Sequence, residues 1–318
     1  MATNLSRREM MARTGACLGA ATLLNPAAAQ AEPSPPEPKE PFRYCLNTGT
    51  LRGFQLPLAE EAKIASAAGY QGIEPWLDNV HRYADAGGSL PDLKKQIADL
   101  GLTVEGAIGF PNWAVEDDAK RQEALEQLRR DMDLMVQIGG LRIAVPPAGI
   151  NQRSDLDLRK IAERYRTVLE MGRKAGIVPH LEIWGAAKTL GRVSEAAFVA
   201  VEADHPDACL LLDIFHVYRS GCGFNGLRLL GGLAMHVLHV NDYPADPPRD
   251  KITDASRVFP TDGIAPLGQI FRDLYAAGYR GVLSLELFNR EYWKREPLWV
   301  AKTGLAKTKA AVLRAFSA

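Results

Sequence analysis

Short apolar runs alternate with longer segments of helical period from Phe42 onward, and this alternation constrains the fold of the 318-residue chain more than any other feature. Strands that alternate with helices along a chain usually pair side by side in a parallel sheet. The apolar runs are short, rich in branched and aromatic side chains, and flanked by glycine or proline. We expect eight strands, within residues 42–48, 69–76, 102–110, 141–147, 177–184, 208–216, 235–242 and 281–288.

The segments between these runs carry the spacing of helices. In residues 118–140, apolar side chains recur at steps of three and four residues, which places them on one face of a helix. This face consists of Ala124, Leu128, Met132, Met135 and Ile138. Glycine also follows several expected helices, where a left-handed residue ends the helix. These glycines are Gly69, Gly101, Gly139, Gly176 and Gly278.

Eight strands with intervening helices predict an α/β fold, a single (β/α)8 TIM barrel over residues 42–318. An open doubly wound sheet is the alternative, but no dinucleotide-binding glycine fingerprint follows the first expected strand. The composition, with 47% hydrophobic and 24% charged residues, is sufficient for one large core. We therefore expect a single barrel domain after the N-terminal segment.

The N-terminal residues 1–31 are expected to be an export signal. The adjacent Arg7 and Arg8 precede a short apolar segment and a stretch of small residues. The apolar segment is too short to span a bilayer, and paired arginines favour the twin-arginine route. We therefore expect a periplasmic or secreted protein without a stable membrane anchor; a retained basic amphipathic arm is the alternative. The proline-rich residues 32–41 are expected to form an extended linker.

The charge balance argues against nucleic acid as a partner. Lysine and arginine total 38, aspartate and glutamate also total 38, and the formal net charge is zero. Nucleic-acid binding depends on an excess of positive charge that neutralises phosphates. The cysteines that follow the linker have irregular spacing, which predicts no disulfide framework. A small-molecule substrate is the expected partner, and a homo-oligomer is compatible with the sequence.

Ionisable side chains lie at the ends of the last four expected strands. In a (β/α)8 barrel the carboxyl ends of the strands carry the active site. A carboxylate within an apolar run costs free energy unless it is paired or bound to a cation. Three carboxylates and one imidazole form an oxygen-rich site for a divalent metal, with Mn²⁺, Mg²⁺, Co²⁺ and Zn²⁺ all compatible. The candidate ligands are Glu182, Asp213, His239 and Glu286.

Each of these residues also has a structural explanation when it is taken alone. A single carboxylate can cap a helix or pair with an arginine, and a single histidine is more often hydrogen-bonded in a core than bound to metal. The occurrence of all four at matched strand ends favours a shared site. His236 lies on the opposite face of its strand from His239, so we expect it to be structural. His180 is expected to pack below Glu182.

Several segments resemble the xylose-isomerase-like TIM barrel superfamily, the sugar phosphate isomerase/epimerase group that includes hydroxypyruvate isomerase, tagatose-type 3-epimerases and inosose dehydratase. The resemblance covers the chain from Phe42 onward and is most specific in the last four strands. It implies one divalent metal held by the four candidate ligands, with Glu182 and Glu286 as acid/base residues. The segments are "GYQGIEPW", "LEIW", "LLLDIFHVYRSG", "HVLHVNDYP" and "GVLSLELF".

The resemblance also implies residues that bind substrate. His216, three residues after Asp213, corresponds to a histidine near the metal and the substrate. Arg249 is the nearest match to a substrate-binding arginine after the seventh strand, although its offset from His239 differs from that of the epimerases. Lys188 stands where ketose epimerases commonly carry a second substrate-binding glutamate, which argues against a tagatose-type substrate.

Other side chains at the strand ends are candidates for the wall of a carbohydrate pocket. Aromatic faces pack against the C–H surfaces of sugars, although packing at the mouth of the barrel is the alternative explanation. Asn241 shares the strand face of His239 and is expected to contact substrate. The aromatic candidates are Trp76, Trp184 and the two aromatic residues of "GFPNW", Phe110 and Trp113, and the polar wall candidates are Glu74 and Asp242.

This set of residues predicts chemistry at a carbon next to a carbonyl group. A divalent ion would polarise a ketone oxygen, and Glu182 and Glu286 would remove and return a proton through an enediolate. The expected activity is that of a sugar or keto-sugar isomerase or epimerase. The alternatives are a lyase or dehydratase acting on an inosose or a 3-keto-glycoside, and a barrel that binds carbohydrate without turnover. A DNA-repair endonuclease of related fold is a more distant alternative, disfavoured by the balanced charge.

Overall fold

The structure is a computed structural model that describes residues 40–317. The expected signal peptide at residues 1–31 and most of the expected linker at residues 32–41 lie outside the described residues, so both assignments stay predictions. Within residues 40–317, none of the helices has the length and apolar character needed to cross a bilayer.

Eight parallel strands form one sheet, and each lies within a run that the sequence predicts. The strand order is β3-β2-β1-β8-β7-β6-β5-β4, so the first and the last strands of the chain are hydrogen-bonded neighbours. The strands are β1 (Arg43–Asn47), β2 (Gly72–Glu74), β3 (Thr103–Val104), β4 (Arg142–Val145), β5 (Val178–Glu182), β6 (Leu210–Asp213), β7 (Met235–Val240) and β8 (Val282–Leu285).

Hydrogen bonds between the β3 and β4 segments close this sheet into a barrel. The backbone N–H of Leu141 donates to the carbonyl of Val104 at 3.2 Å, and that of Ala144 donates to the carbonyl of Ala107 at 2.9 Å. Closure removes the open edges that a doubly wound sheet would retain. The predicted (β/α)8 barrel is therefore confirmed.

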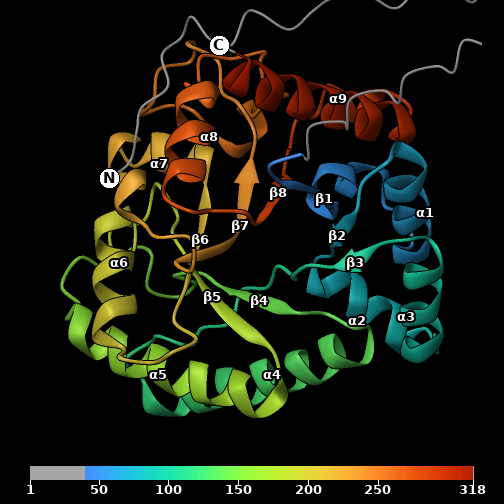
Figure 1. Ribbon diagram of the computed structural model, residues 1–318. Helices are drawn as coiled ribbons and strands as arrows, with labels where there is room; N and C mark the ends of the chain where they lie inside the picture. The colour runs from blue at the N-terminus through green and yellow to red at the C-terminus, as the bar shows by residue number, and fades with distance from the viewer. Residues whose placement is uncertain (1–39, 318) are drawn as a thin grey trace, which may run out of the picture. The chain divides into compact units, whose positions relative to one another are not determined.

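The helices surround the strands as an outer layer (Figure 1). The α-helices are α1 (Leu58–Ala68), α2 (Leu77–Asp85), α3 (Leu90–Asp99), α4 (Asp118–Gln137), α5 (Leu158–Ala175), α6 (Val193–Glu202), α7 (Ile214–Arg219), α8 (Leu267–Ala276) and α9 (Pro297–Phe316). Short 3₁₀ helices lie at η1 (Thr48–Phe54), η2 (Asn225–Leu229), η3 (Asp254–Ser256) and η4 (Tyr292–Lys294).

Helix α4 illustrates how local sequence sets these elements. The side chain of Asp117 accepts a hydrogen bond from the backbone N–H of Lys120 at 3.0 Å and caps the helix. On the predicted apolar face, Leu128, Met132 and Met135 are fully buried. The five glycines predicted to end helices all have positive φ angles, between 74° and 95°.

The inner face of the barrel changes from apolar to polar toward the carboxyl ends of the strands. Residues two apart on a strand face the same side. On β6, Leu211 precedes Asp213 on the inner face, and on β7, Val237 precedes His239 in the same way. Leu211 and Val237 belong to a small buried apolar cluster inside the barrel. This cluster supports the ionisable side chains that follow it.

One buried carboxyl group outside the barrel interior makes the stability of the fold depend on pH. Glu61 on α1 is 1% exposed, and its Oε2 accepts a hydrogen bond from Asn79 Nδ2 at 2.9 Å. Burial raises the pKa of Glu61 from 4.5 to about 7. A raised pKa favours the protonated acid in the fold, so ionisation destabilises the fold as the pH rises from about 4.5 through about 7.

We expect Glu61→Gln to be more stable than the parent protein at pH 8, by up to about 3 kcal/mol, and to lose this advantage at pH 5. Urea denaturation at the two pH values measures the difference. Glu60→Gln is the matched control, because Glu60 is an exposed neighbour on the same helix. An equal stability gain for Glu61→Gln at both pH values would contradict the role assigned to ionisation.

Candidate active site

The four predicted metal ligands all come from the carboxyl ends of neighbouring strands. Glu182 is the last residue of β5, Asp213 is the last residue of β6, and Glu286 directly follows β8. His239 lies one residue before the end of β7 and is in parallel register with Asp213. The alternation of residues along each strand turns these side chains toward the inside of the barrel.

Three of the four residues form a close cluster of donor atoms. Asp213, His239 and Glu286 each offer an atom within 4.8 Å of the others, and all three side chains are buried. His239 Nδ1 lies 3.3 Å from Glu286 Oε2 and 3.7 Å from Asp213 Oδ2, and has no hydrogen-bond partner among residues 40–317. An imidazole nitrogen without a partner beside two carboxylates is a donor set that fits a divalent metal.

Glu182 lies beside this cluster but outside it. Its side chain lines the same cavity as Glu286, and its Oε2 atom is buried without a hydrogen-bond partner among residues 40–317. Burial raises the pKa of Glu182 from 4.5 to about 8. The charge of His239 opposes this shift, and the nearby carboxylates Glu286 and Asp213 add to it. The structure thus gathers three of the predicted ligands and places the fourth next to them as an unpaired carboxyl group.

Glu74 on β2 holds the far side of the His239 ring. Its Oε2 atom lies 3.0 Å from His239 Nε2 and accepts hydrogen bonds from Asn47 Nδ2 at 3.0 Å and Ser284 Oγ at 2.7 Å. Burial opposes ionisation of Glu74, but the charge of His239 and the hydrogen bonds from His239 and Ser284 outweigh it and lower the pKa of Glu74 to about 2. A carboxylate at Nε2 orients the imidazole so that Nδ1 is presented to the other donor atoms.

Arg257 is a site residue that the sequence analysis did not identify. Its guanidinium is 1% exposed, and its Nη1 atom donates to Asp213 Oδ2 at 2.6 Å and to Glu286 Oε2 at 2.9 Å. Its Nη2 atom donates to Asp254 Oδ1 at 2.7 Å. This buried arginine pairs with two of the clustered carboxylates, and its single positive charge offsets part of their negative charge.

The predicted substrate-binding Arg249 lies elsewhere. It is exposed and does not line the cavity that contains Glu182 and Glu286. Both Arg249 and Arg257 belong to the long loop after β7, so the offset from His239 alone did not separate them. The structure shows that this loop returns to the strand ends only near Val258, whose backbone pairs with that of Asp242.

The cavity above the cluster has a volume of about 610 Å³ and one aromatic side. Trp76 contacts Phe110 edge-to-face with ring centroids 5.2 Å apart, and contacts Phe288 at 5.7 Å. Phe110 contacts Trp184 at 5.9 Å. These rings form a continuous wall, which we call the aromatic wall, and it offers an apolar surface of the kind that sugar C–H groups pack against.

The remaining predicted substrate contacts divide into one cavity residue and three that lie outside the cavity lining. His216 lines the cavity; its backbone N–H donates to Asp213 Oδ1 at 2.9 Å, and its ring Nε2 lies 3.4 Å from Arg257 Nη2. Burial lowers the pKa of His216, which favours the neutral imidazole. Asn241 is buried and donates from Nδ2 to Asp213 Oδ2 at 3.0 Å, so it supports a candidate ligand.

Trp113 and Lys188 lie away from the cavity for different reasons. Trp113 is fully buried in the core, where its indole N–H donates to the carbonyl of Pro146 at 2.8 Å and its ring packs against Tyr165. Lys188 is exposed, and its backbone N–H donates to the carbonyl of Asn151. Of the two aromatic residues in the motif "GFPNW", Phe110 lines the cavity and Trp113 does not.

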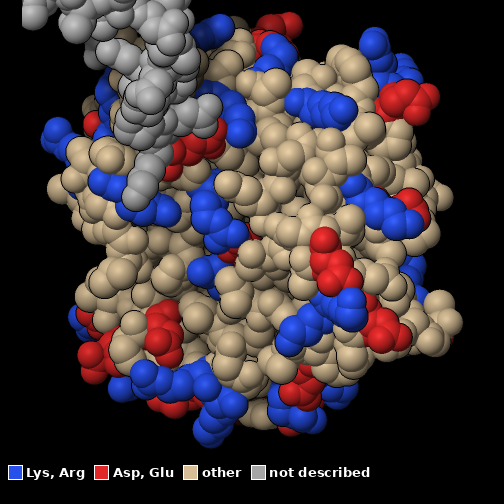
Figure 2. Space-filling view, turned by 45° about the vertical axis from the view of Figure 1, so that its right-hand side comes forward, with Lys and Arg blue, Asp and Glu red and all other residues tan. Residues whose placement is uncertain are grey.

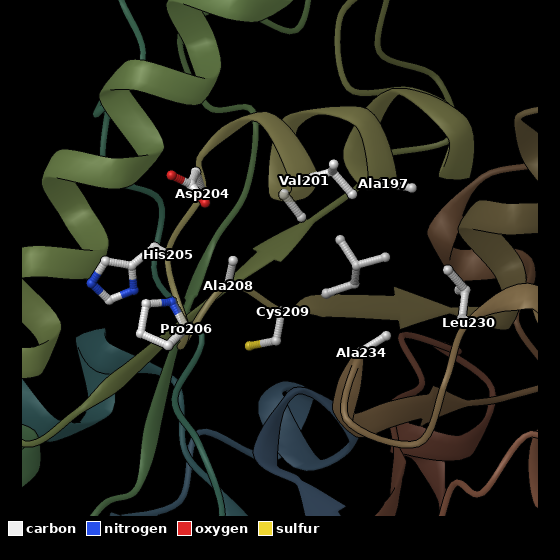
Figure 3. A pocket seen from close by; sticks show the side chains of 11 residues that line it. Ala197, Val201, Asp204, His205, Pro206, Ala208, Cys209, Leu230 and Ala234 are labelled. Carbon is white, nitrogen blue, oxygen red and sulfur yellow. The ribbon is translucent and has the colours of Figure 1, made fainter.

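A second pocket of about 560 Å³ lies at the opposite end of the strands (Figure 3). It is lined mainly by small and apolar side chains of α6 and of the segment that leads into β6, including Ala197, Val201 and Cys209. His205 at its edge accepts a hydrogen bond on Nδ1 from the backbone N–H of Asp207 at 3.2 Å. Since catalysis in this fold takes place at the carboxyl ends of the strands, this pocket is not the expected catalytic site.

The charged side chains on the surface are mixed in sign. Figure 2 shows lysine and arginine interspersed with aspartate and glutamate over the face in view. This distribution agrees with the formal net charge of zero. Steering of a large charged polymer needs an extended field of one sign, which this face does not present.

Comparisons with known proteins show that the chain is similar to members of one family of TIM barrels. The family model described as xylose isomerase-like TIM barrel matches residues 62–315. An inosose isomerase of Bacillus velezensis is 25% identical over 283 residues, which cover 86% of this chain and 99% of that protein. A fructoselysine 3-epimerase of Escherichia coli O157:H7 is 25% identical, with coverage of 80% and 94%.

Other similar proteins include a dehydratase and a zinc-containing structure. A 3-dehydroshikimate dehydratase of Pseudomonas putida is 25% identical over 237 residues, 73% of this chain, and the match spans only 36% of the dehydratase's own length. The solved structure of the IolI protein with a bound zinc atom superimposes with a TM-score of 0.78 at 22% identity, covering 87% of this chain and all of that one.

Proposed function

The chain belongs to the xylose isomerase-like TIM barrel family, and on this premise we propose that it is a metal-dependent isomerase or epimerase of a small keto-sugar. The reaction that fits the site is proton transfer at a carbon next to a carbonyl group. One observation carries the proposal: Glu182 and Glu286, from two separate strands, line a single cavity beside the cluster of Asp213, His239 and Glu286.

Each carboxyl group has a distinct environment and therefore a distinct part in the reaction. Glu182 Oε2 has no partner among residues 40–317, so it is available to accept a proton from a bound substrate or to donate one. Glu286 Oε2 accepts from Arg257 Nη1 at 2.9 Å, which fixes this carboxylate at the cavity wall. The two groups come from β5 and from the segment after β8, so they approach the cavity from different parts of the wall.

The remaining groups bind and orient the substrate. The aromatic wall would pack against the C–H face of the keto-sugar and exclude water from one side of the cavity. His216 and Arg257 present nitrogen atoms to the hydroxyl and carbonyl groups of the substrate. A divalent ion held by Asp213, His239 and Glu286 would supply Lewis-acid stabilisation of negative charge on the carbonyl oxygen.

The names of the similar proteins support this reaction class. Two of them are called an inosose isomerase and a fructoselysine 3-epimerase, and both matches extend over most of this chain and of those proteins. The zinc atom in the IolI structure supports the assignment of a divalent metal. The identity of the metal in this chain is part of the proposal, with Mn²⁺, Mg²⁺, Co²⁺ and Zn²⁺ as candidates.

A dehydratase is the second candidate, supported by the position of His216. Its side chain lines the cavity, and its Nδ1 atom is buried without a hydrogen-bond partner among residues 40–317. After the same first proton transfer, a substrate hydroxyl group on the second carbon from the carbonyl could leave as water by taking up the proton that Glu182 removed, while this ring donates a hydrogen bond to the leaving oxygen. The similarity to 3-dehydroshikimate dehydratase favours the same outcome.

Incubation in deuterated water with a panel of keto-sugars and keto-inositols tests the proposal. We expect one substrate to gain deuterium at the carbon beside its carbonyl group and to yield an isomer or epimer, seen by NMR and mass spectrometry. A product that has lost water identifies the dehydratase instead. If compounds of the panel bind but none gains deuterium or forms a product, both reactions are contradicted. The remaining alternative is then a barrel that binds carbohydrate without turnover.

A further inference from the structure

We infer that the substrate of this site carries an anionic group, a carboxylate or a phosphate, and that Arg219 binds it. The inference rests on the proposed function only in taking the cavity of about 610 Å³ as the substrate site. Proton transfer next to a carbonyl group requires neither an anionic group on the substrate nor an arginine that binds it.

The environment of Arg219 is the main observation. Arg219 is the last residue of α7 and lines the cavity together with Glu182 and Glu286. Its Nη1 atom is buried and has no hydrogen-bond partner among residues 40–317, and within the same range its side chain forms no ion pair. The Arg219 side chain as a whole is half-buried. A buried N–H donor of a charged group is unfavourable without a partner, so the partner of Nη1 is expected to come from the ligand.

Capping of α7 does not account for this arginine. A cation near the C-terminus of a helix is often held by the last carbonyl groups. In α7 those groups already have partners: the carbonyl of His216 accepts from the backbone N–H of Ser220 at 3.0 Å, and that of Val217 accepts from Ser220 Oγ at 2.7 Å. The guanidinium of Arg219 is therefore left for the cavity.

Two other arginines, Arg257 and Arg290, line the same cavity. Arg257 is paired with Asp213, Glu286 and Asp254, so its charge is balanced within the protein. Arg290 lines the same cavity, is exposed, and within residues 40–317 forms no ion pair. The cavity thus contains two arginine side chains that form no ion pair with a carboxylate of residues 40–317.

The geometry of a guanidinium selects the ligand group. Its planar N–H donors match the paired oxygens of a carboxylate or a phosphate, and such charge-assisted hydrogen bonds are stronger than those to a neutral hydroxyl. A neutral keto-sugar would leave Arg219 with hydroxyl partners only. A keto-acid or a sugar phosphate would fill the cavity and neutralise the arginine.

Isothermal titration of the purified protein with matched acids and neutral analogues tests the inference. The probes are quinate against methyl quinate for a carboxylate, and myo-inositol 1-phosphate against myo-inositol for a phosphate. We expect one anion to bind about 10- to 100-fold more tightly than its neutral analogue. Arg219→Met should abolish this preference and leave the affinity for the neutral analogue unchanged, and Arg219→Lys should restore part of the preference.

Arg228→Met is the matched control, because Arg228 is an exposed arginine of η2 outside the cavity lining. Equal binding of acid and neutral analogue by the parent protein, or no binding of either anion, would overturn the inference, and this comparison needs no variant to fold. A preference that survives Arg219→Met but is lost in Arg290→Met would overturn the assignment to Arg219. The titration measures binding and does not depend on turnover. If the protein prefers an anion but no compound of the panel reacts, the proposed reaction is wrong and this inference stands. If only neutral substrates react, this inference is wrong and the proposed reaction stands.

Discussion

Glutamine in place of Glu182 is expected to lower the turnover number by about 10²–10⁴-fold and to leave the bound metal unchanged. The side chain lines the cavity with an unpaired Oε2 atom and lies outside the close cluster of donor atoms, so its role in our proposal is proton transfer. Glutamine keeps the shape of the side chain but cannot exchange a proton at physiological pH. The variant should therefore still bind substrate while its deuterium exchange is lost.

Three measurements on Glu182→Gln separate the candidate roles of this residue. Metal content by mass spectrometry and substrate affinity by titration should match those of the parent, whereas exchange from deuterated water should fall with turnover. Glu61→Gln is the matched control, since it removes a buried carboxyl of the same barrel at a position outside the cavity lining. Loss of metal from Glu182→Gln would instead make Glu182 a fourth ligand, and parent-like turnover would remove it from the mechanism.

The strand ends could be identified from sequence because the barrel follows simple periodic rules. Each strand was marked by an apolar run, and an ionisable residue near its end stands on the inner face by parity. Asp213 and His239 were found in this way, and the structure places their donor atoms 3.7 Å apart. The positions of such residues depend on the local sequence and on the closure of the sheet, and the alternation of strands and helices predicts both.

Other parts of the site depend on long-range geometry that a single sequence does not reveal. The pairing of Glu74 with His239 joins β2 to β7 across the barrel interior, between residues 165 positions apart. Glu74 was recognised only as a polar wall candidate, although a glutamate within the apolar run "GIEPW" already indicated a buried partner. Arg257 reaches the cluster because of the path of a long loop, which no periodic rule determines.

The direction of the Trp113 side chain could also not be predicted from the sequence. Parity along a strand cannot be extended past Pro111, where the chain leaves the barrel wall. The turn directs Trp113 into the core and leaves Phe110 on the cavity. The structure places Trp76, Trp184 and Phe110 on the cavity and Trp113 away from it, and the part of these rings in binding a sugar stays a prediction.

The largest effect on metal binding is expected from His239→Ala, which should leave the purified protein without bound metal and without activity. The substitution removes the only nitrogen donor of the described three-residue cluster and leaves the carboxylates of Asp213 and Glu286 close together without it. Glu74→Gln should weaken metal affinity by about 10–100-fold, because the imidazole would keep its place but lose the carboxylate that orients it. Competition with a chromophoric chelator measures both affinities without reference to turnover.

His236→Ala is the matched control for this series, because it removes a histidine of the same strand that lies outside the donor cluster. It should retain the metal content and the affinity of the parent. If His239→Ala bound as much metal as the parent, the carboxyl ends of β6, β7 and β8 would not be a metal site, and the buried pairing of Arg257 with Asp213 and Glu286 would be the complete explanation for those carboxylates. We expect a graded loss of metal affinity, with Glu74→Gln between the parent and His239→Ala. This pattern would indicate that His239 Nδ1 holds the metal and that Glu74 orients the imidazole through Nε2.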